Sequence, residues 1–185
     1  MKTLFPSKGP RAGVKRLLVS RAVGGPPHQG RLICGTLTLR CALGRSGVTS
    51  DKREGDGATP RGRLELLYAL LRPARFSRAS FLPPARFLRE KDIWCDDPRS
   101  FRYNRPLRGP SKLSHEELWR SDRLYDFIGV LDHNIRPARL GRGSAIFFHI
   151  ATDDLGPTAG CVALRARDMA RLLPRLARRA ALEVK

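Results

Sequence analysis

Hydrophobic and polar residues alternate along several stretches of this chain, with the period of half-buried β-strands. In residues 30–43, Leu37 and Leu39 alternate with polar neighbours, and Gly35 marks a hairpin turn. Further strands are expected over residues 14–19, 125–131 and 144–151, and after Thr59-Pro60, where Leu64, Leu66 and Tyr68 share one face. Many short strands and few helices predict a mainly β sandwich or barrel with a few short helices.

Two segments are expected to be helical. Ser114 and Glu117 have the spacing of a capping box, which predicts a short helix through Leu118 and Trp119. Near the C-terminus, apolar residues recur at helical spacing from Asp168 onward, and Pro174 interrupts them. Four arginines there share one helix face, which is either a solvated basic face or a contact for a polyanion: Arg167, Arg171, Arg175 and Arg179. The expected organisation is a flexible N-terminus (1–13), a single domain (14–176) and a basic C-terminal tail (177–185).

The charge of the chain is strongly basic. Lysine and arginine number 36 and aspartate and glutamate 17, which leaves a net charge of +19. Such a charge attracts polyanions, among them nucleic acid, anionic lipid and acidic cell-wall polymer. The basic residues are spread along the chain rather than gathered into one tail, so nucleic acid is not the expected partner. No apolar run approaches the roughly 18 residues of a membrane helix, and no export signal is expected near the N-terminus.

The four cysteines, at positions 34, 41, 95 and 161, form no CxxC pair and have no histidine at zinc-finger spacing. No metal or other cofactor is therefore expected. The disulfide status of Cys34, Cys41 and Cys95 stays open, as does the oligomeric state.

One stretch combines a histidine on a strand, a turn and a cysteine. His149 shares a strand face with Phe147 and Ala151, and Cys161 follows twelve residues later, after Gly160. A thiol beside an imidazole can act as a nucleophile with its base, and an imidazolium lowers the pKa of the thiol. The alternative is a buried free cysteine with a core histidine, and His133 could also serve as the base.

These residues resemble the signature of the L,D-transpeptidase catalytic domain family, in which a histidine is followed by Ser/Thr-His-Gly-Cys-hydrophobic-Asn. The resemblance extends upstream over most of residues 14–176. It is carried by Thr158-Ala159-Gly160-Cys161-Val162, by Thr59-Pro60-Arg61-Gly62, by the segment 51–57, and by Trp94-Cys95-Asp96-Asp97-Pro98 with Tyr103-Asn104. Two positions depart from the signature, because Ala159 replaces its histidine and Ala163 its asparagine, and the spacing between His149 and Cys161 is short.

The resemblance implies a cysteine acyl transferase that acts on peptidoglycan stem peptides, releases D-alanine and forms 3→3 cross-links through a thioester on Cys161. His149 would be the base, Thr158 would support the loop, and the N–H groups of Gly160 and Cys161 would bind the oxyanion. Four residues form either a substrate wall or a loop held by its own hydrogen bonds: Trp94, Asp96, Tyr103 and Asn104.

Two other functions stay open at this point: a hydrolase or L,D-carboxypeptidase of the same fold, and a non-catalytic basic module that binds polyanions. The presumed substrate implies a location in the periplasm or cell wall. The lack of a recognisable export signal leaves a cytoplasmic location open.

Overall fold

A computed structural model describes residues 13–73, 75 and 83–185, and β-strands dominate it. The expected flexible segment 1–13 lies outside the described residues, except for Gly13. The elements, in chain order, are β1 Val14–Arg21, β2 Gln29–Cys34, β3 Leu37–Ala42, β4 Val48–Thr49, β5 Thr59–Pro60, β6 Gly62–Leu71, β7 Ala85–Phe87, β8 Asp92–Cys95, β9 Arg105–Arg108, β10 His115–Glu117, β11 Phe127–Leu131, β12 Phe147–Ile150, β13 Val162–Leu164, α1 Ala166–Leu172, a 3₁₀ turn at Leu173–Arg175 and β14 Leu176–Val184.

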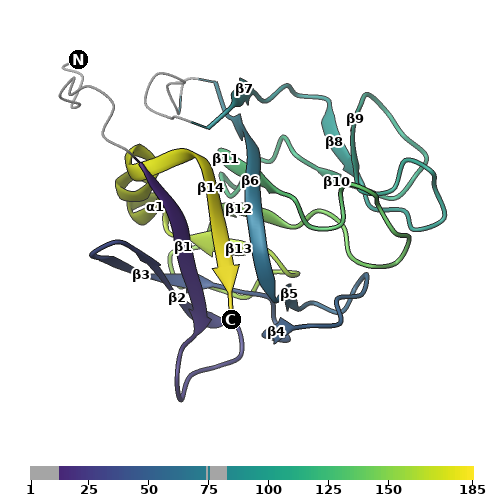
Figure 1. The fold of residues 1–185 in the computed structure, drawn as a ribbon. Helices are drawn as coiled ribbons and strands as arrows, with labels where there is room; N and C mark the ends of the chain where they lie inside the picture. Colours follow the sequence, from purple (N-terminus) through teal and green to yellow (C-terminus); the bar gives the residue numbers. More distant parts are fainter. Residues whose placement is uncertain (1–12, 74, 76–82) are drawn as a thin grey trace.

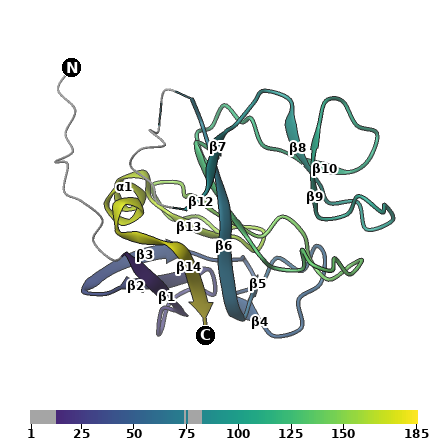
Figure 2. The same ribbon diagram turned by 45° about the horizontal axis from the view of Figure 1, so that its top comes forward.

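The largest sheet has nine strands in the order β11-β12-β13-β3-β2-β1-β14-β6-β7, and an additional pairing of β11 with β6 closes it into a barrel-like form (Figures 1 and 2). The predicted hairpin at Gly35 is present, since β2 and β3 pair antiparallel from Gln29–Ala42 to Cys34–Leu37. Gly35 has φ +60°, a conformation that glycine adopts without strain. The expectation of a mainly β fold with a short helix near the C-terminus is confirmed.

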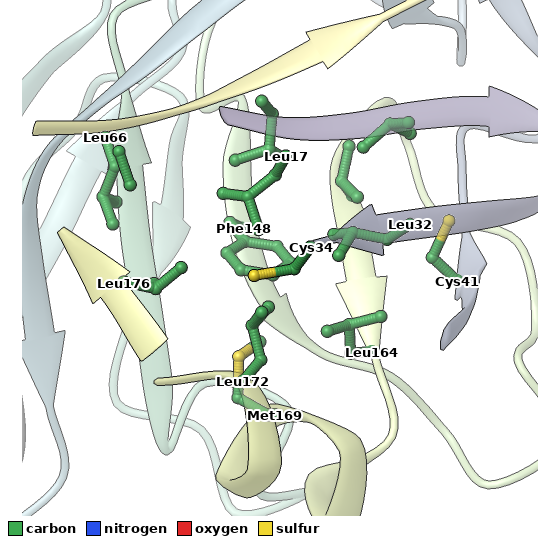
Figure 3. Close-up of a cluster of buried hydrophobic side chains, with 14 of the residues drawn as sticks. Leu17, Leu32, Cys34, Cys41, Leu66, Phe148, Leu164, Met169, Leu172 and Leu176 are labelled. Atoms are coloured by element: carbon green, nitrogen blue, oxygen red, sulfur yellow. The ribbon is translucent and has the colours of Figure 1, made fainter. Parts of the chain in front are cut away.

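The inner faces of these strands enclose the main hydrophobic core. Leu17, Leu32, Leu66 and Phe148 meet there, and Met169 of α1 packs against them (Figure 3). Phe148 is fully buried, and burying a side chain of this size contributes roughly 1.5–3 kcal/mol. The core contains residues from eight strands of the sheet and from α1. It therefore packs β1, the first strand, together with β14, the last.

The C-terminal segment differs from the expected helix and basic tail. The helix α1 ends at Leu172, because Pro174 lacks the N–H that would continue it. The chain then enters β14, which pairs in parallel with β1 and antiparallel with β6. The tail prediction is wrong for residues 177–184, since Leu182 is fully buried between two central strands. Pairing on both sides outweighs the modest strand propensity of its alanines and arginines.

Two local predictions also need correction. The segment after Ser114 is the short strand β10, not a helix, because Glu116 pairs with Trp94 of β8. In β6, Leu64 and Leu66 face the main core, whereas Tyr68 packs in another cluster. A register irregularity opposite Leu131 inserts one extra residue, and one extra residue reverses the alternation of a strand.

A second hydrophobic cluster lies on the outer face of β6, β11 and β12. It joins the barrel-like sheet to the small three-stranded sheet β10-β8-β9. Trp94 contributes from the small sheet and packs edge-on against Phe147 of β12, with ring centroids 5.2 Å apart. Cys161 belongs to this cluster, which therefore forms the floor beneath the candidate site.

Within the described part of the chain, no helix has the length and hydrophobicity of a membrane span.

Candidate active site

The two candidate residues lie on adjacent parallel strands, His149 within one and Cys161 just before the other. His149 is in β12, opposite Ala163 of β13, and Cys161 immediately precedes β13. Both side chains line the same cavity, which has a volume of about 320 Å³. Each residue is only 6% exposed. The strand pairing therefore brings together two groups that eleven residues, 150–160, separate in the sequence.

The sulfur of Cys161 is held by the backbone of the segment that leads into β12. The Phe147 N–H donates to Sγ at 3.3 Å, and the thiol donates to the Ala145 carbonyl at 3.3 Å. Ala145 has φ +50°, which is unusual for a residue with a side chain. This conformation is part of the geometry that presents its carbonyl to the thiol.

The imidazole of His149 has a defined tautomer. Its Nδ1 lies 2.8 Å from the Ile150 carbonyl oxygen. Because a carbonyl oxygen only accepts, Nδ1 carries the proton in this contact. The backbone of Leu124 also interacts with the ring, and both contacts act to raise the pKa of His149. The ring of Tyr125 lies edge-on to the imidazole, with centroids 5.1 Å apart. Among the described residues no hydrogen bond joins His149 to Cys161, so their relation in this structure is a shared cavity.

Burial decides the protonation states of both groups. It lowers the pKa of His149 to about 4. It also raises the pKa of the Cys161 thiol to about 12, and the nearby Glu116 adds to this rise. The resting pair is thus a neutral thiol and a neutral imidazole. The sequence-based expectation that an imidazolium lowers the pKa of the thiol is therefore wrong for this structure. Burial removes water from both side chains, and this loss of hydration disfavours the thiolate and the imidazolium alike.

The loop before Cys161 is fixed by Thr158 and Gly160. The Thr158 hydroxyl donates to the Cys161 carbonyl at 2.7 Å and accepts the Gly160 N–H at 3.2 Å. Gly160 has φ +139°, and a Cβ there would lie 2.8 Å from the Ala58 carbonyl oxygen. Position 160 therefore admits only glycine without a shift of the backbone.

Three of the four expected wall residues lie behind the cavity. Trp94, Tyr103 and Asn104 are about 1% exposed and are not among the lining residues, whereas Asp96 is. The Asn104 Oδ1 accepts the Trp94 Nε1–H at 2.9 Å and the Ala145 N–H at 3.1 Å. The loop is thus held by its own hydrogen bonds, the alternative left open by the sequence, and it positions the carbonyl that binds the thiol.

Several charged residues that the sequence reasoning did not single out also line the cavity. The Tyr125 hydroxyl donates to Glu116 at 2.6 Å, and the Arg120 guanidinium lies 5.1 Å from the Tyr125 ring centroid. Burial raises the pKa of the Glu116 carboxyl above its usual range. Glu54 accepts hydrogen bonds from Ser144 and Tyr103. The sequence pattern predicts only a helix cap for residues 114–117. The pairing of β10 with β8 brings Glu116 into the cavity wall.

His133, the alternative base, is not among the residues that line this cavity. Its Nε2 lies 3.0 Å from the Arg142 carbonyl and donates to it. Within the described residues, no three His, Cys, Asp or Glu side chains gather in an arrangement that could hold a metal ion.

A barrel-like β fold with a cysteine and a histidine lining one cavity defines a candidate cysteine-dependent site. Comparison with protein families then identifies the chain. The model of the L,D-transpeptidase catalytic domain (YkuD) matches residues 29–184, and the chain belongs to this family. Searches of curated proteins and of solved structures each give no match.

The two departures from the family signature lie on either side of the candidate pair. Ala159 lines the cavity, so its methyl group leaves open the space that a histidine side chain would fill. Ala163 is fully buried opposite His149, with Ala42 as its partner on β3. The family's asparagine would have to fit into this cluster of small side chains, which also contains Ala151.

Proposed function

We propose that this protein is an acyl transferase that cleaves peptidoglycan stem peptides through a thioester on Cys161 and forms 3→3 cross-links. The observation that carries the proposal is the shared cavity of Cys161 and His149, in a chain of the L,D-transpeptidase family. Thr158 and Gly160 support the loop that carries the nucleophile.

The proposed first step starts from the neutral pair. The Cys161 S–H proton moves from its hydrogen bond with Ala145 to the imidazole of His149 as Sγ attacks the carbonyl carbon at the L-centre of diaminopimelate. The C–N bond of the tetrahedral intermediate then breaks, and the imidazolium returns the proton to the departing amine of D-alanine. Because Nδ1–H stays on the Ile150 carbonyl, the ring keeps one orientation through both transfers.

The second step resolves the thioester. A side-chain amine of another stem attacks the thioester carbonyl and gives a proton to His149, and the C–S bond breaks to restore the thiol. Attack by water in place of the amine yields a hydrolase. The Phe147 N–H, which already donates to Sγ, stabilises the sulfur when it carries negative charge. For the oxyanion we assign the N–H of Cys161 together with that of Gly160, which must exchange its 3.2 Å bond to Thr158 for the substrate.

The proposed substrate lies outside the cytoplasmic membrane, so the proposal includes a location in the periplasm or cell wall. Fractionation of cells that produce the native chain tests this part separately, by recovery in the periplasmic or wall fraction.

Intact-protein mass spectrometry after exposure to a carbapenem tests the nucleophile. We expect one adduct on Cys161, its loss in Cys161→Ala and a slower reaction in His149→Gln. Cys95→Ala is the matched control, because Cys95 is buried in β8 and does not line the cavity. Failure of the wild-type chain to form the adduct would overturn the proposal.

Incubation with a purified disaccharide tetrapeptide then separates the reactions. A cross-linked dimer with release of D-alanine supports transpeptidation, and a tripeptide without dimer identifies the hydrolase. A basic polyanion-binding module would show neither product. Instead it would show salt-sensitive binding to sacculi that is unchanged in Cys161→Ala.

A further inference from the structure

Lys52 is the buried cationic side chain of the cavity wall, where Arg45 is exposed and Arg120 half-buried. Its side chain is 6% exposed, and its Nζ lies 2.5 Å from Asp56 Oδ1. The ammonium also donates to the Arg53 carbonyl at 2.9 Å. A lysine is seldom buried to this degree unless it is paired, because the charge loses its hydration. Lys52 lines the cavity that contains Cys161, and the chemistry proposed above does not use it.

Lys52 and Asp56 connect the two backbone segments that flank the thiol. The stem of Lys52 packs against Gly143, where a Cβ would lie 2.8 Å from the lysine Cγ, and Gly143 is two residues before Ala145. The Asp56 Oδ1 also accepts the Ala58 N–H at 2.8 Å. The Ala58 carbonyl in turn lies where a side chain at position 160 would be. One ion pair thus contacts both walls around the sulfur.

The charges around Cys161 are mixed. The cavity wall carries the acidic residues Glu54, Asp96 and Glu116 and the basic residues Arg45, Lys52 and Arg120. Burial is the largest influence on the Cys161 pKa, and Glu116 adds to the rise, whereas the Phe147 N–H and Lys52 act in the lowering direction. Lys52 is thus the charged side chain that favours the thiolate.

We infer that Lys52 is a positioning residue for Cys161: its buried ammonium, held in place by Asp56, stabilises negative charge on the sulfur as the thiol gives up its proton. This role rests on the proposed function of Cys161. Asp56 sets how much of the lysine charge the sulfur experiences. Burial tends to raise the Asp56 pKa, but hydrogen bonds from Lys52 and from the Ala58 and Arg53 N–H groups outweigh it and hold the pKa below its usual range. The lowered pKa favours the carboxylate of Asp56, which lies 2.5 Å from the Lys52 Nζ.

The test compares four variants by the pH dependence of Cys161 alkylation with iodoacetamide, followed by mass spectrometry on the folded protein. Lys52→Met removes the charge and keeps the stem, so we expect alkylation at a given pH to slow about tenfold, equivalent to about one pKa unit. Lys52→Arg keeps the charge and should retain at least about a third of the rate.

Asp56→Asn keeps an acceptor for Lys52 but leaves its charge uncompensated, so alkylation should become faster. Arg53→Gln, a neighbour whose side chain is 66% exposed, is the matched control for loss of one positive charge.

The opposite signs of Lys52→Met and Asp56→Asn separate an electrostatic role from a structural one. A lysine that only fastened the loop would make both variants change the rate in the same direction, and that result overturns the inference, as does an unchanged rate in Lys52→Met. If Lys52→Met does not fold, the other two variants decide: a retained rate in Lys52→Arg with a faster rate in Asp56→Asn supports the inference, and a slower rate in Asp56→Asn overturns it. The alkylation assay is independent of the proposed function. Alkylation that depends on Lys52 without any carbapenem adduct would refute the transferase and leave only the electrostatic effect of Lys52 on the thiol. A carbapenem adduct with alkylation that does not depend on Lys52 would keep the transferase and overturn the inference.

Discussion

Replacement of Asn104 by leucine removes four hydrogen bonds from the backbone behind the candidate nucleophile. Its Oδ1 accepts from Trp94 and Ala145, and its Nδ2 donates to the His133 and Asn134 carbonyls at 3.1 and 2.7 Å. The side chain is about 1% exposed, so water cannot replace it readily. Each buried polar group left without a partner costs about 1–3 kcal/mol. Leucine also disfavours the φ of +55° at this position.

For Asn104→Leu we therefore expect the free energy of unfolding to fall by about 4–6 kcal/mol, because the four groups share one side chain and partly relax together. Urea denaturation with an unchanged m-value measures it. Acylation of Cys161 should slow as well, since the displaced Ala145 carbonyl is the acceptor of its thiol. Trp94→Phe, which removes one of the four bonds, is the graded control at about 1 kcal/mol. A loss below about 1 kcal/mol in Asn104→Leu would refute the reasoning.

Three further outcomes follow from the same geometry. Gly160→Ala places a Cβ 2.8 Å from the Ala58 carbonyl oxygen. We therefore expect the free energy of unfolding, measured by urea denaturation, to fall by about 2–3 kcal/mol, and carbapenem acylation to become slower. Wild-type values for both would contradict this prediction. The folded-state pKa of His149 is about 4, below the roughly 6.5 of the unfolded chain, so its stabilisation is complete above pH 6.5 and lost as the pH falls toward 4, by about 3 kcal/mol. Urea titrations of His149→Gln should show a flatter pH dependence over that range, and an unchanged slope would contradict the neutral buried ring. Deletion of residues 176–185 removes a central strand and should leave the chain unable to fold, as judged by circular dichroism; a folded product would show that this segment is dispensable.

Local patterns predicted much of the fold because they report on burial. The hairpin at Gly35 and the alternation of Phe147 and Phe148 on β12 follow from a period of two residues, and the structure confirms both. The sequence predicted that adjacent strands bring His149 and Cys161 within hydrogen-bond reach. The structure places them on parallel strands around one cavity, with no hydrogen bond between these two described side chains.

Partners far away in the sequence decided the rest. The segment after Pro174 has helical spacing, and it becomes a strand because β1 and β6 offer pairing on both sides. Glu116 enters the cavity wall through the pairing of β10 with β8. For Trp94 and Asn104 the sequence left open a substrate wall or a loop held by its own hydrogen bonds. They are buried because their hydrogen bonds are satisfied by each other and by the loop of Asn134.

By itself, the sequence determined which side chains alternate between apolar and polar surroundings, and it singled out Cys161 and His149 as the thiol and imidazole of one candidate site. Only the tertiary structure decided the charge state of that pair, because the pKa of a thiol or an imidazole depends on how much water surrounds it. Burial keeps Cys161 protonated and His149 neutral, and packing places Lys52, paired with Asp56, in the same cavity. These are properties of packing among segments that lie roughly a hundred residues apart in the chain, so no local pattern contains them.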